Sequence, residues 1–313
     1  MRPPCSIVIP TYNARDLVDR CLLSLLPAVE IGHDEIIVVD DGSTDDTTAM
    51  LLEKYPDVHV EPLDLNQGFG AACNIGVERS NYNLVLLLNN DIVVSEGFLD
   101  PLTSHFNNPA VFAANAAVFK KDGATPGGGL VRGYLHYGLL RLRWAEKQDE
   151  RKQKTLTLYA NGAATIIDRK KYQSLNGFDP IYHPFYSEDL DISYRAYQRG
   201  WVVVFEPAST VIHDHSVTIT GNHAPDYISY ISKRNRIIFV LKNISGRSRL
   251  MVCSFWLAVR FLGCILTMDG IFFRAIRDVI NKIPEIIRAR DEDRSRYLSD
   301  EKIKKMTSQW YLK

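Results

Sequence analysis

Three carboxylates lie within four positions of the sequence, at Glu188, Asp189 and Asp191. They belong to the stretch HPFYSEDLDISYR (183–195), beside aromatic rings and just ahead of an apolar helical pattern. Like charges that crowd a carboxylate raise its pKa and make it a better general base. A helix start explains the same residues, because Ser187 can cap it and the helix dipole favours acids in the first turn. Taken alone, the stretch favours the helix start.

Polar or glycine-rich segments also follow each of the first four predicted strands, at 11–13, 40–43, 66–70 and 89–91. Ordinary turns need the same residue types, namely Asn, Asp, Gly and Ser. In a parallel sheet, however, ligands bind at the carboxyl ends of the strands. The shared position of the four segments on one sheet edge therefore favours a ligand site.

The elements that would position these residues alternate between strands and helices. Predicted strands at 6–10, 35–41, 58–61 and 83–91 are each followed by an amphipathic helical pattern. Four such pairs in succession predict an α/β fold with a doubly wound parallel sheet and helices on both faces.

The rest of the chain is less regular. We expect a flexible insertion over 119–158, then a strand and a short helix within 161–178, and a further strand at 201–207. Beyond 226 the pattern is helical to the end of the chain. The predicted organisation is a catalytic domain over 1–225 and a helical C-terminal region over 226–313.

Composition excludes several classes of protein. Lys+Arg and Asp+Glu balance at 37 each, so no overall field attracts nucleic acid, and we expect no nucleic-acid partner. The five cysteines are scattered, which indicates neither a disulfide framework nor a thiolate zinc site. The apolar run CSIVIP ends at Pro10 and is too short for a signal peptide, so we expect a cytoplasmic protein.

One apolar tract, 250–273, approaches the length of a membrane span. It contains Arg260 and Asp269, and a charge near the centre of a spanning helix costs at least about 2.5 kcal/mol. We therefore expect a tract that is buried, interfacial or dimer-forming. Peripheral contact with the cytoplasmic face of a membrane and homo-oligomerisation both stay open.

Five motifs occur in a characteristic order: SIVIPTYN, IIVVDDGSTDDT, NQGFGAACNIG, LLLNNDIVV and GFDPIYHPFYSEDLDISYRAYQRGW. In order and spacing they closely resemble family 2 glycosyltransferases over roughly residues 5 to 245. Within that family, YISKRNRIIFVLKN (230–243) and the charged C-terminal tail look most like rhamnosyltransferase-type members. The resemblance implies the GT-A fold, a Rossmann-like, doubly wound mixed sheet with a helical C-terminal extension.

An enzyme of this kind transfers a sugar from a nucleoside diphosphate to an acceptor hydroxyl. The resemblance implies that Asp41 accepts a hydrogen bond from a pyrimidine ring nitrogen, whereas an Asx-turn or helix cap is the structural alternative. The full set of donor-binding residues that it implies is Pro10, Thr11, Tyr12, Asp41, Asn66, Gly70, Asn89 and Asn90.

The resemblance further implies a divalent cation, Mg²⁺ or Mn²⁺, with Asp91 as carboxylate ligand and His213 as a further contact. Asn89 stands where the family often has an acid, and His215 is read as an exposed loop histidine. Asp189 corresponds to the family's general base, beside Glu188. A single in-line displacement would then invert the anomeric carbon.

Several residues are weaker candidates for contacts with the acceptor or the transferred sugar. Tyr186 and Trp201 could stack as walls, although core packing explains them equally. Arg234 could bind a phosphate of the donor or of a lipid carrier, although an ordinary charged residue on a helix surface is an equally good interpretation. The full set is Asp179, Tyr186, Asp191, Trp201 and Arg234.

Two other functions stay open at this point. A nicotinamide-dependent oxidoreductase is suggested by GFG at 68–70, but Cys73 stands where a third glycine belongs and the turn follows the third strand. A non-catalytic membrane-associated scaffold is suggested by the arginines among apolar residues after 246. The scaffold predicts no nucleotide binding, whereas the enzyme predicts a nucleoside-diphosphate sugar donor and a glycan or lipid-linked acceptor.

Overall fold

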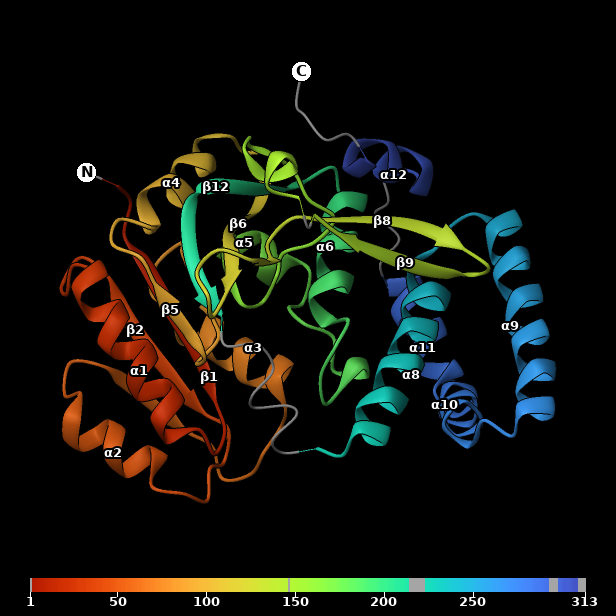
Figure 1. Cartoon of the computed structure of the whole chain (residues 1–313), viewed down its shortest axis with the longest axis horizontal. Helices are drawn as coiled ribbons and strands as arrows, with labels where there is room; N and C mark the ends of the chain where they lie inside the picture. The colour runs from red at the N-terminus through yellow and green to blue at the C-terminus, as the bar shows by residue number, and fades with distance from the viewer. Residues whose placement is uncertain (1, 146, 214–222, 293–297, 309–313) are drawn as a thin grey trace.

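The computed structural model describes residues 2–145, 147–213, 223–292 and 298–308. Its centre is a large mixed sheet with helices on both faces (Figure 1). The strand order is β10-β12-β6-β11-β4-β1-β2-β3, with β5 paired to β12 and β7 paired to β6.

The N-terminal half of the sheet is parallel and matches the predicted strand and helix pairs. Its strands are β1 (Cys5–Thr11), β2 (Glu35–Asp40), β3 (His59–Pro62) and β4 (Leu84–Leu88). Every residue of β1 and β4 is buried, as expected for strands that are covered on both faces. The connecting helices are α1 (Arg15–Leu25), α2 (Thr47–Lys54) and α3 (Phe69–Arg79).

The second half makes the sheet mixed. β11 (Ala164–Asp168) runs antiparallel to both β4 and β6 (Val111–Lys120), and β12 (Val202–His213) runs parallel to β6. The short strand β5 (Ile92–Val94) pairs with the end of β12. The helices of this half are α4 (Leu99–Thr103), α5 (Arg169–Ser174) and α6 (Glu188–Gln198), with single 3₁₀ turns at Ser104–Asn107, Gln148–Arg151 and Pro180–Tyr182. A further 3₁₀ turn, Leu26–Ala28, follows α1 in the first half.

The segment 119–158, expected to be a flexible insertion, contains regular strands, so that expectation is wrong. β7 (Pro126–Gly128) and β10 (Thr155–Leu156) extend the main sheet, and β8 (Val131–His136) pairs with β9 (Leu139–Trp144) as a separate hairpin. The sequence LLRLRW of β9 alternates apolar and basic residues, which is the pattern of a strand with one face covered.

Two apolar cores lie on opposite faces of the sheet. Alternate side chains of a strand point to opposite faces, so Ile7 and Ile9 of β1 join the core under α1, whereas Val8 joins the core under α3. Gly76 allows α3 to lie close to β1, because a Cβ atom there would lie 2.2 Å from Val8 Cγ1.

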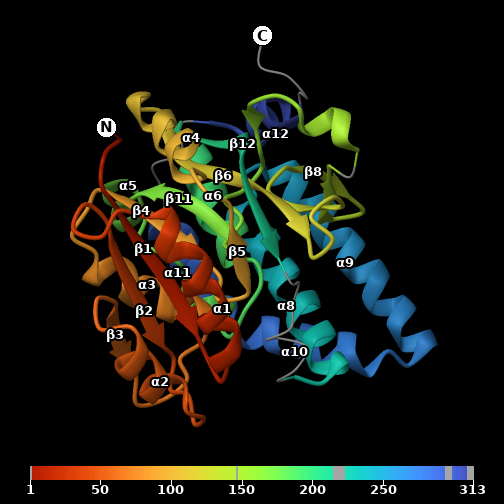
Figure 2. The same cartoon turned by 60° about the vertical axis from the view of Figure 1, so that its left-hand side comes forward.

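The C-terminal helices are α8 (Pro225–Asn243), α9 (Arg247–Thr267), α10 (Gly270–Asn281), α11 (Ile283–Glu292) and α12 (Asp300–Ser308). Phe239 of α8, Phe272 of α10 and Ile303 of α12 belong to the same core as α3, so these helices pack on the α3 face of the sheet. α9 stands at the outer edge, where the β8–β9 hairpin reaches it (Figures 1 and 2).

Candidate active site

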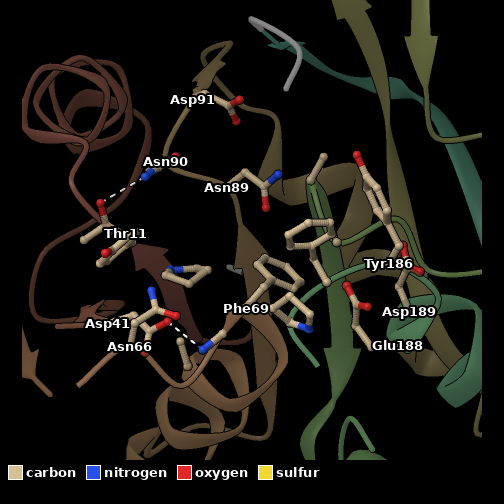
Figure 3. Close-up of a pocket in the computed structure, with 18 of the residues that line it drawn as sticks. Thr11, Asp41, Asn66, Phe69, Asn89, Asn90, Asp91, Tyr186, Glu188 and Asp189 are labelled. Atoms are coloured by element: carbon tan, nitrogen blue, oxygen red, sulfur yellow. Dashed lines mark hydrogen bonds between the residues drawn. The ribbon is translucent and has the colours of Figure 1, made fainter. Parts of the chain in front are cut away.

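A cavity of about 280 Å³ opens at the carboxyl ends of β1, β2 and β4, the edge where the sequence predicted a ligand site. Figure 3 shows Thr11, Asp41 and Asn66 on one side of this space, and Glu188 and Asp189 on the other. The predicted residues that line it are Pro10, Thr11, Tyr12, Asp41, Asn66, Asn89, Asn90, Asp91, Tyr186, Glu188, Asp189 and His213.

Hydrogen bonds fix the side of the cavity that the resemblance assigns to the nucleoside. Asn90 Nδ2 donates to Thr11 Oγ1 over 2.9 Å. The two carboxylate oxygens of Asp41 accept from the backbone N–H groups of Gln67 (2.7 Å) and Gly68 (2.8 Å), and burial raises the pKa of Asp41. Since each carboxylate oxygen can accept a second hydrogen bond, Asp41 holds the loop before α3 and keeps capacity for a ligand donor.

Glycines bring this loop close to the other wall. Gly68 has φ of +88°, and a Cβ atom there would lie 2.8 Å from His183 Nδ1 and 2.9 Å from the carbonyl oxygen of Pro184. Gly70, predicted to contact the donor, does not line the cavity; a Cβ atom on it would lie 3.9 Å from Glu188 Cγ. Gly70 therefore lies behind the lining residues, where a Cβ atom would make only ordinary van der Waals contacts.

Asp91 and His213 approach each other at the upper end of the cavity. Oδ1 of Asp91 lies 2.9 Å from Nε2 of His213. This follows from the sheet register, in which Ile92 of β5 stands opposite His213 of β12. Oδ1 of Asp91 is buried and accepts no hydrogen bond from the described residues, and the same holds for Oδ1 of Asn89, two residues earlier.

A carboxylate and an imidazole at this distance fit a divalent cation as two of its ligands. Within the described residues, no group of three or more His, Cys, Asp or Glu side chains could hold a metal by itself. Among the described residues, Asp91 and His213 are the two that would hold the cation. His215 lies outside the described residues.

The opposite wall begins with the first two residues of α6. Burial raises the pKa of Asp189 to about 6, and the N–H of Leu190, which donates to Asp189 Oδ1 over 2.7 Å, limits that rise. Burial and then the charge of Asp189 raise the pKa of Glu188 well above its usual range. Near neutral pH the wall therefore holds a carboxylate at Asp189, beside a Glu188 whose environment favours the neutral carboxyl form.

The chain enters α6 through two consecutive left-handed residues, Tyr186 (φ +72°) and Ser187 (φ +81°). The predicted cap is wrong, because no side-chain hydrogen bond closes this helix start. The entry is held from α8 instead: Asn235 Nδ2 lies within hydrogen-bond distance of the carbonyl oxygens of Tyr182 (2.8 Å), Phe185 (2.9 Å) and Tyr186 (2.7 Å). Asn235 thus positions the acids at the cavity.

Asp191, the third acid of the stretch, points away from the cavity and is fully buried. It accepts hydrogen bonds from Tyr182 Oη (2.8 Å), Arg195 Nε (2.7 Å), Lys242 Nζ (2.9 Å) and Asn243 Nδ2 (2.7 Å). Burial opposes ionisation, but the charges of Lys242 and Arg195 hold the pKa of Asp191 far below its usual range. The sequence predicted that Asp191 contacts the acceptor or the transferred sugar. In the structure Asp191 instead holds α6 against its neighbours and does not line the cavity.

Three weaker candidates also lie elsewhere. Asp179 accepts from Ile181 N and from Lys242 Nζ, and it lines a separate cavity. Trp201 packs against the core, with Lys171 Nζ 5.9 Å from its ring centre. Arg234 is buried, and it donates to the carbonyl oxygen of His183 and to Asn235 Oδ1. Of the weaker set, only Tyr186 borders the catalytic cavity.

Some of the cavity's lining residues were not predicted. Phe69 lies within the GFGAACNIG motif, so its position could have been noticed, but Asn161 and His223 stand in stretches without a distinctive chemical pattern. The unpredicted lining residues are Gly68, Phe69, Ala72, Asn161, Gly162, Ala163, Pro184, Phe185 and His223.

Comparisons with known proteins agree with this geometry. Residues 6–175 match the family model "Glycosyl transferase family 2". The chain is 26% identical over 264 residues to N-acetylglucosaminyl-diphospho-decaprenol L-rhamnosyltransferase of Mycobacterium tuberculosis, covering 77% of this chain and 85% of that protein. It is 27% identical over 248 residues to the O-antigen biosynthesis protein RfbC of Myxococcus xanthus, covering 74% of this chain but only 19% of RfbC.

A solved structure shares the fold. The crystal structure of GalNAc-T7 with UDP, GalNAc and Mn²⁺ superposes with a TM-score of 0.61 at 18% identity, over 77% of this chain and 48% of that one. At this identity the likeness concerns the fold, which is GT-A. Together with the match of the family model to more than half of the sequence, it shows that the chain belongs to glycosyl transferase family 2.

Proposed function

We propose that this protein is an inverting glycosyltransferase that transfers a hexosyl or deoxyhexosyl group, with rhamnose as first candidate, from a UDP- or dTDP-sugar. The acceptor is a hydroxyl of a glycan or a lipid-linked glycan, in polysaccharide assembly on the cytoplasmic face of the membrane. The relative named a decaprenol L-rhamnosyltransferase supports the sugar, and the O-antigen relative supports the process. GalNAc-T7, crystallised with UDP and Mn²⁺, supports a nucleoside diphosphate and a divalent cation.

The observation that carries this proposal is the arrangement of one cavity with Asp91 and His213 at one end and Asp189 at the other. The diphosphate of the donor belongs at the Asp91 end and its sugar between the two walls. A Mg²⁺ or Mn²⁺ ion held by Asp91 and His213 would act as a Lewis acid on the leaving diphosphate.

Asp189 takes the chemical role of general base. Its carboxylate accepts the proton of the acceptor hydroxyl while that oxygen forms a bond to the anomeric carbon. The bond from the anomeric carbon to the donor phosphate oxygen breaks, and its electron pair leaves with the nucleoside diphosphate. One displacement inverts the configuration. A pKa of about 6 suits this role, because Asp189 is ionised near neutral pH and is more basic than an ordinary carboxylate.

Glu188 has a different state and therefore a different role. Burial and the charge of Asp189 raise the pKa of Glu188 and so favour its neutral form, in which it can donate a hydrogen bond to a sugar oxygen or to Asp189. The Glu188 Oε2 atom is buried and has no hydrogen-bond partner among the described residues, which leaves it free for a bound sugar.

Calorimetric binding of UDP, dTDP, GDP and NAD, each with and without Mn²⁺, tests the donor class. We expect UDP or dTDP to bind only with the metal. Asp91→Asn should weaken this binding and turnover together, whereas Asp189→Asn should keep the binding and lose turnover. Equal loss of binding in both variants would disprove the assignment of roles.

The same experiment tests the scaffold alternative, which predicts no nucleotide binding under any of these conditions. NAD binding would instead support the oxidoreductase alternative. The glycine turn at Gly68 gives little support for it, since this turn follows β3 at the edge of the sheet instead of the first strand.

A further inference from the structure

A second, larger cleft of about 1260 Å³ adjoins the catalytic cavity. The two spaces share Asp189, Tyr186 and Asn161, so the candidate base faces both. The cleft has more than four times the volume of the catalytic cavity and exceeds the range of about 300 to 1,000 Å³ that is typical of small-molecule sites. A molecule that presents a hydroxyl to Asp189 from this side can therefore be larger than a single sugar.

One wall of the cleft is a single face of α8. The residues of α8 that line it recur at helical spacing, and they are Pro225, Ile228, Ser229, Ser232, Arg236 and Phe239. At a rise of about 1.5 Å per residue, the face from Pro225 to Phe239 is about 21 Å long. This wall is therefore long enough for several linked sugar rings, and it offers hydroxyl and guanidinium groups to their oxygens.

A second wall belongs to the β8–β9 hairpin. Leu140, Leu142 and Trp144 of β9 all line the cleft, because alternate residues of a strand point to the same side. Trp144 is 39% exposed, and its ring is held by the buried Tyr159, which lies edge-on with the two ring centres 6.0 Å apart. The wall thus presents to the cleft an aromatic ring whose orientation is fixed from behind.

Trp144 stands where the cleft meets the catalytic cavity. A Cβ atom on Gly128 would lie 3.7 Å from Trp144 Cζ3 and 2.7 Å from Asn161 Nδ2, so both side chains lie against this glycine. Asn161 Oδ1 accepts from the N–H of Ala163 over 3.1 Å. Neither Asn161 Nδ2 nor the indole N–H of Trp144 has a hydrogen-bond partner among the described residues. The junction therefore offers one aromatic ring and two hydrogen-bond donors to a ligand.

A pyranose ring matches this combination of groups. One face of such a ring carries C–H groups, which pack on an aromatic surface, and its edge carries hydroxyl groups, which exchange hydrogen bonds with amide and indole N–H groups. Ligand sites that combine a mostly apolar lining with a few convergent polar groups fix both the position and the orientation of what they bind.

We propose that this cleft binds an acceptor glycan of two or more sugars, and that Trp144 is the stacking platform that selects it. The sugar that gives its hydroxyl to Asp189 lies beside Asn161, which borders both spaces. The next sugar packs on Trp144, because of the two spaces Trp144 lines only the cleft. Further sugars follow the face of α8.

This inference rests on the proposed function and adds to it the length of the acceptor. An acceptor of two or more sugars must itself be the product of an earlier glycosyl transfer. The protein therefore extends a glycan that another transferase has started.

Binding to glycans of graded length tests the platform. Single sugars, disaccharides and tetrasaccharides from bacterial surface polysaccharides are printed as one array, and calorimetry then measures the affinity for the strongest binder. We expect oligosaccharides to bind more tightly than their component single sugars. Trp144→Ala should weaken that binding about tenfold, whereas Trp144→Phe keeps an aromatic ring and should retain most of it.

Two further variants separate the platform from general damage. Ser232→Tyr adds bulk to the α8 wall and should also weaken oligosaccharide binding, without any change at Trp144. Tyr134→Ala is the matched control, since it removes a ring of the same hairpin that is 45% exposed and does not line the cleft. It should bind glycans normally, and thermal melting shows that each variant is folded.

Equal affinity for single sugars and oligosaccharides would overturn the proposal, as would unchanged binding by Trp144→Ala or a failure to bind any glycan of the array. UDP binding with Mn²⁺ is measured on the same samples and should be the same in every variant. Its absence from the unchanged protein, with Trp144-dependent glycan binding retained, would reject the proposed donor chemistry and not the acceptor cleft. UDP binding without any glycan binding would reject only the acceptor cleft.

Discussion

Replacing Asp189 with Asn should abolish turnover and yet stabilise the protein. The pKa of this carboxyl rises from 3.8 to about 6 on folding, and each pKa unit corresponds to about 1.36 kcal/mol. Ionisation of Asp189 therefore costs the folded state up to about 3 kcal/mol at neutral pH. Asn has nearly the same shape and does not ionise, so the variant avoids this cost. It also loses the base, which typically lowers kcat by about 10² to 10⁴.

The sign of the pH dependence follows from the direction of the pKa change. A raised pKa means that the folded state binds the proton more tightly, so the Asp189 carboxyl is best tolerated below pH 3.8, and its stabilising contribution is lost as the pH rises through about 6. The stability advantage of Asp189→Asn should therefore be full above pH 6 and vanish towards pH 4. Turnover of the unchanged protein should rise with pH through about 6, as the base ionises.

Urea unfolding at pH 7.5 and pH 4.5, together with initial rates of sugar transfer, measures both effects. Asp57→Asn, at an exposed position before β3, is the matched control and should alter neither. Turnover retained by Asp189→Asn would refute the role of general base. A variant that is less stable than the unchanged protein at pH 7.5 would refute the reasoning from burial.

Three other substitutions test the parts of the site separately. Asp191→Asn should destabilise the protein by about 3 to 5 kcal/mol, because it removes the buried negative charge that Arg195 and Lys242 both face. Since the pKa of Asp191 is depressed, this loss of stability should be full at neutral pH and shrink in acid, which urea unfolding across pH measures. Gly68→Ala should weaken nucleotide binding and lower the free energy of unfolding by about 1 to 3 kcal/mol. Gly97 also has a positive φ, but a Cβ atom there would meet nothing within 4 Å, so Gly97→Ala should lower stability without changing nucleotide binding. Calorimetric titration measures the binding, and thermal melting measures the stability. Asn235→Ala should lower kcat more than it raises the KM for the donor, because it releases the carbonyl groups before α6 and leaves the Asp41 side of the cavity unchanged. The affinity for UDP should therefore stay the same, and its measurement distinguishes this effect from general damage to the site.

The parallel half of the sheet was predictable because β1, β2 and β4 are runs of Val, Ile and Leu bounded by turn residues. The central strand β6 was not predicted, since VFAANAAVFK is rich in Ala and Asn, which have little preference for strands. Its place is set by tertiary contacts: the side chain of Asn115 bonds the carbonyl oxygens of Gly129 and Tyr159, which lie far away in the sequence.

The roles of the neighbouring acids could have been separated by helix geometry. Successive residues of a helix turn by about 100°, so two positions turn by about 200°. Asp189 and Asp191 must therefore face opposite sides of α6, and a basic partner for Asp191 stands four positions later, at Arg195. The sequence could not show that burial, instead of crowding by Asp191, dominates the pKa of Asp189, because burial depends on what packs around α6.

The same reasoning applies to the basic motif on α8. Arg234 and Asn235 hold the loop before α6, whereas Arg236, the next residue along the helix, lines a second cavity that also includes Asp189. One turn of α8 therefore holds the wall that carries Asp189, through Asn235 and the Tyr186 carbonyl group, and also lines a second cavity, through Arg236.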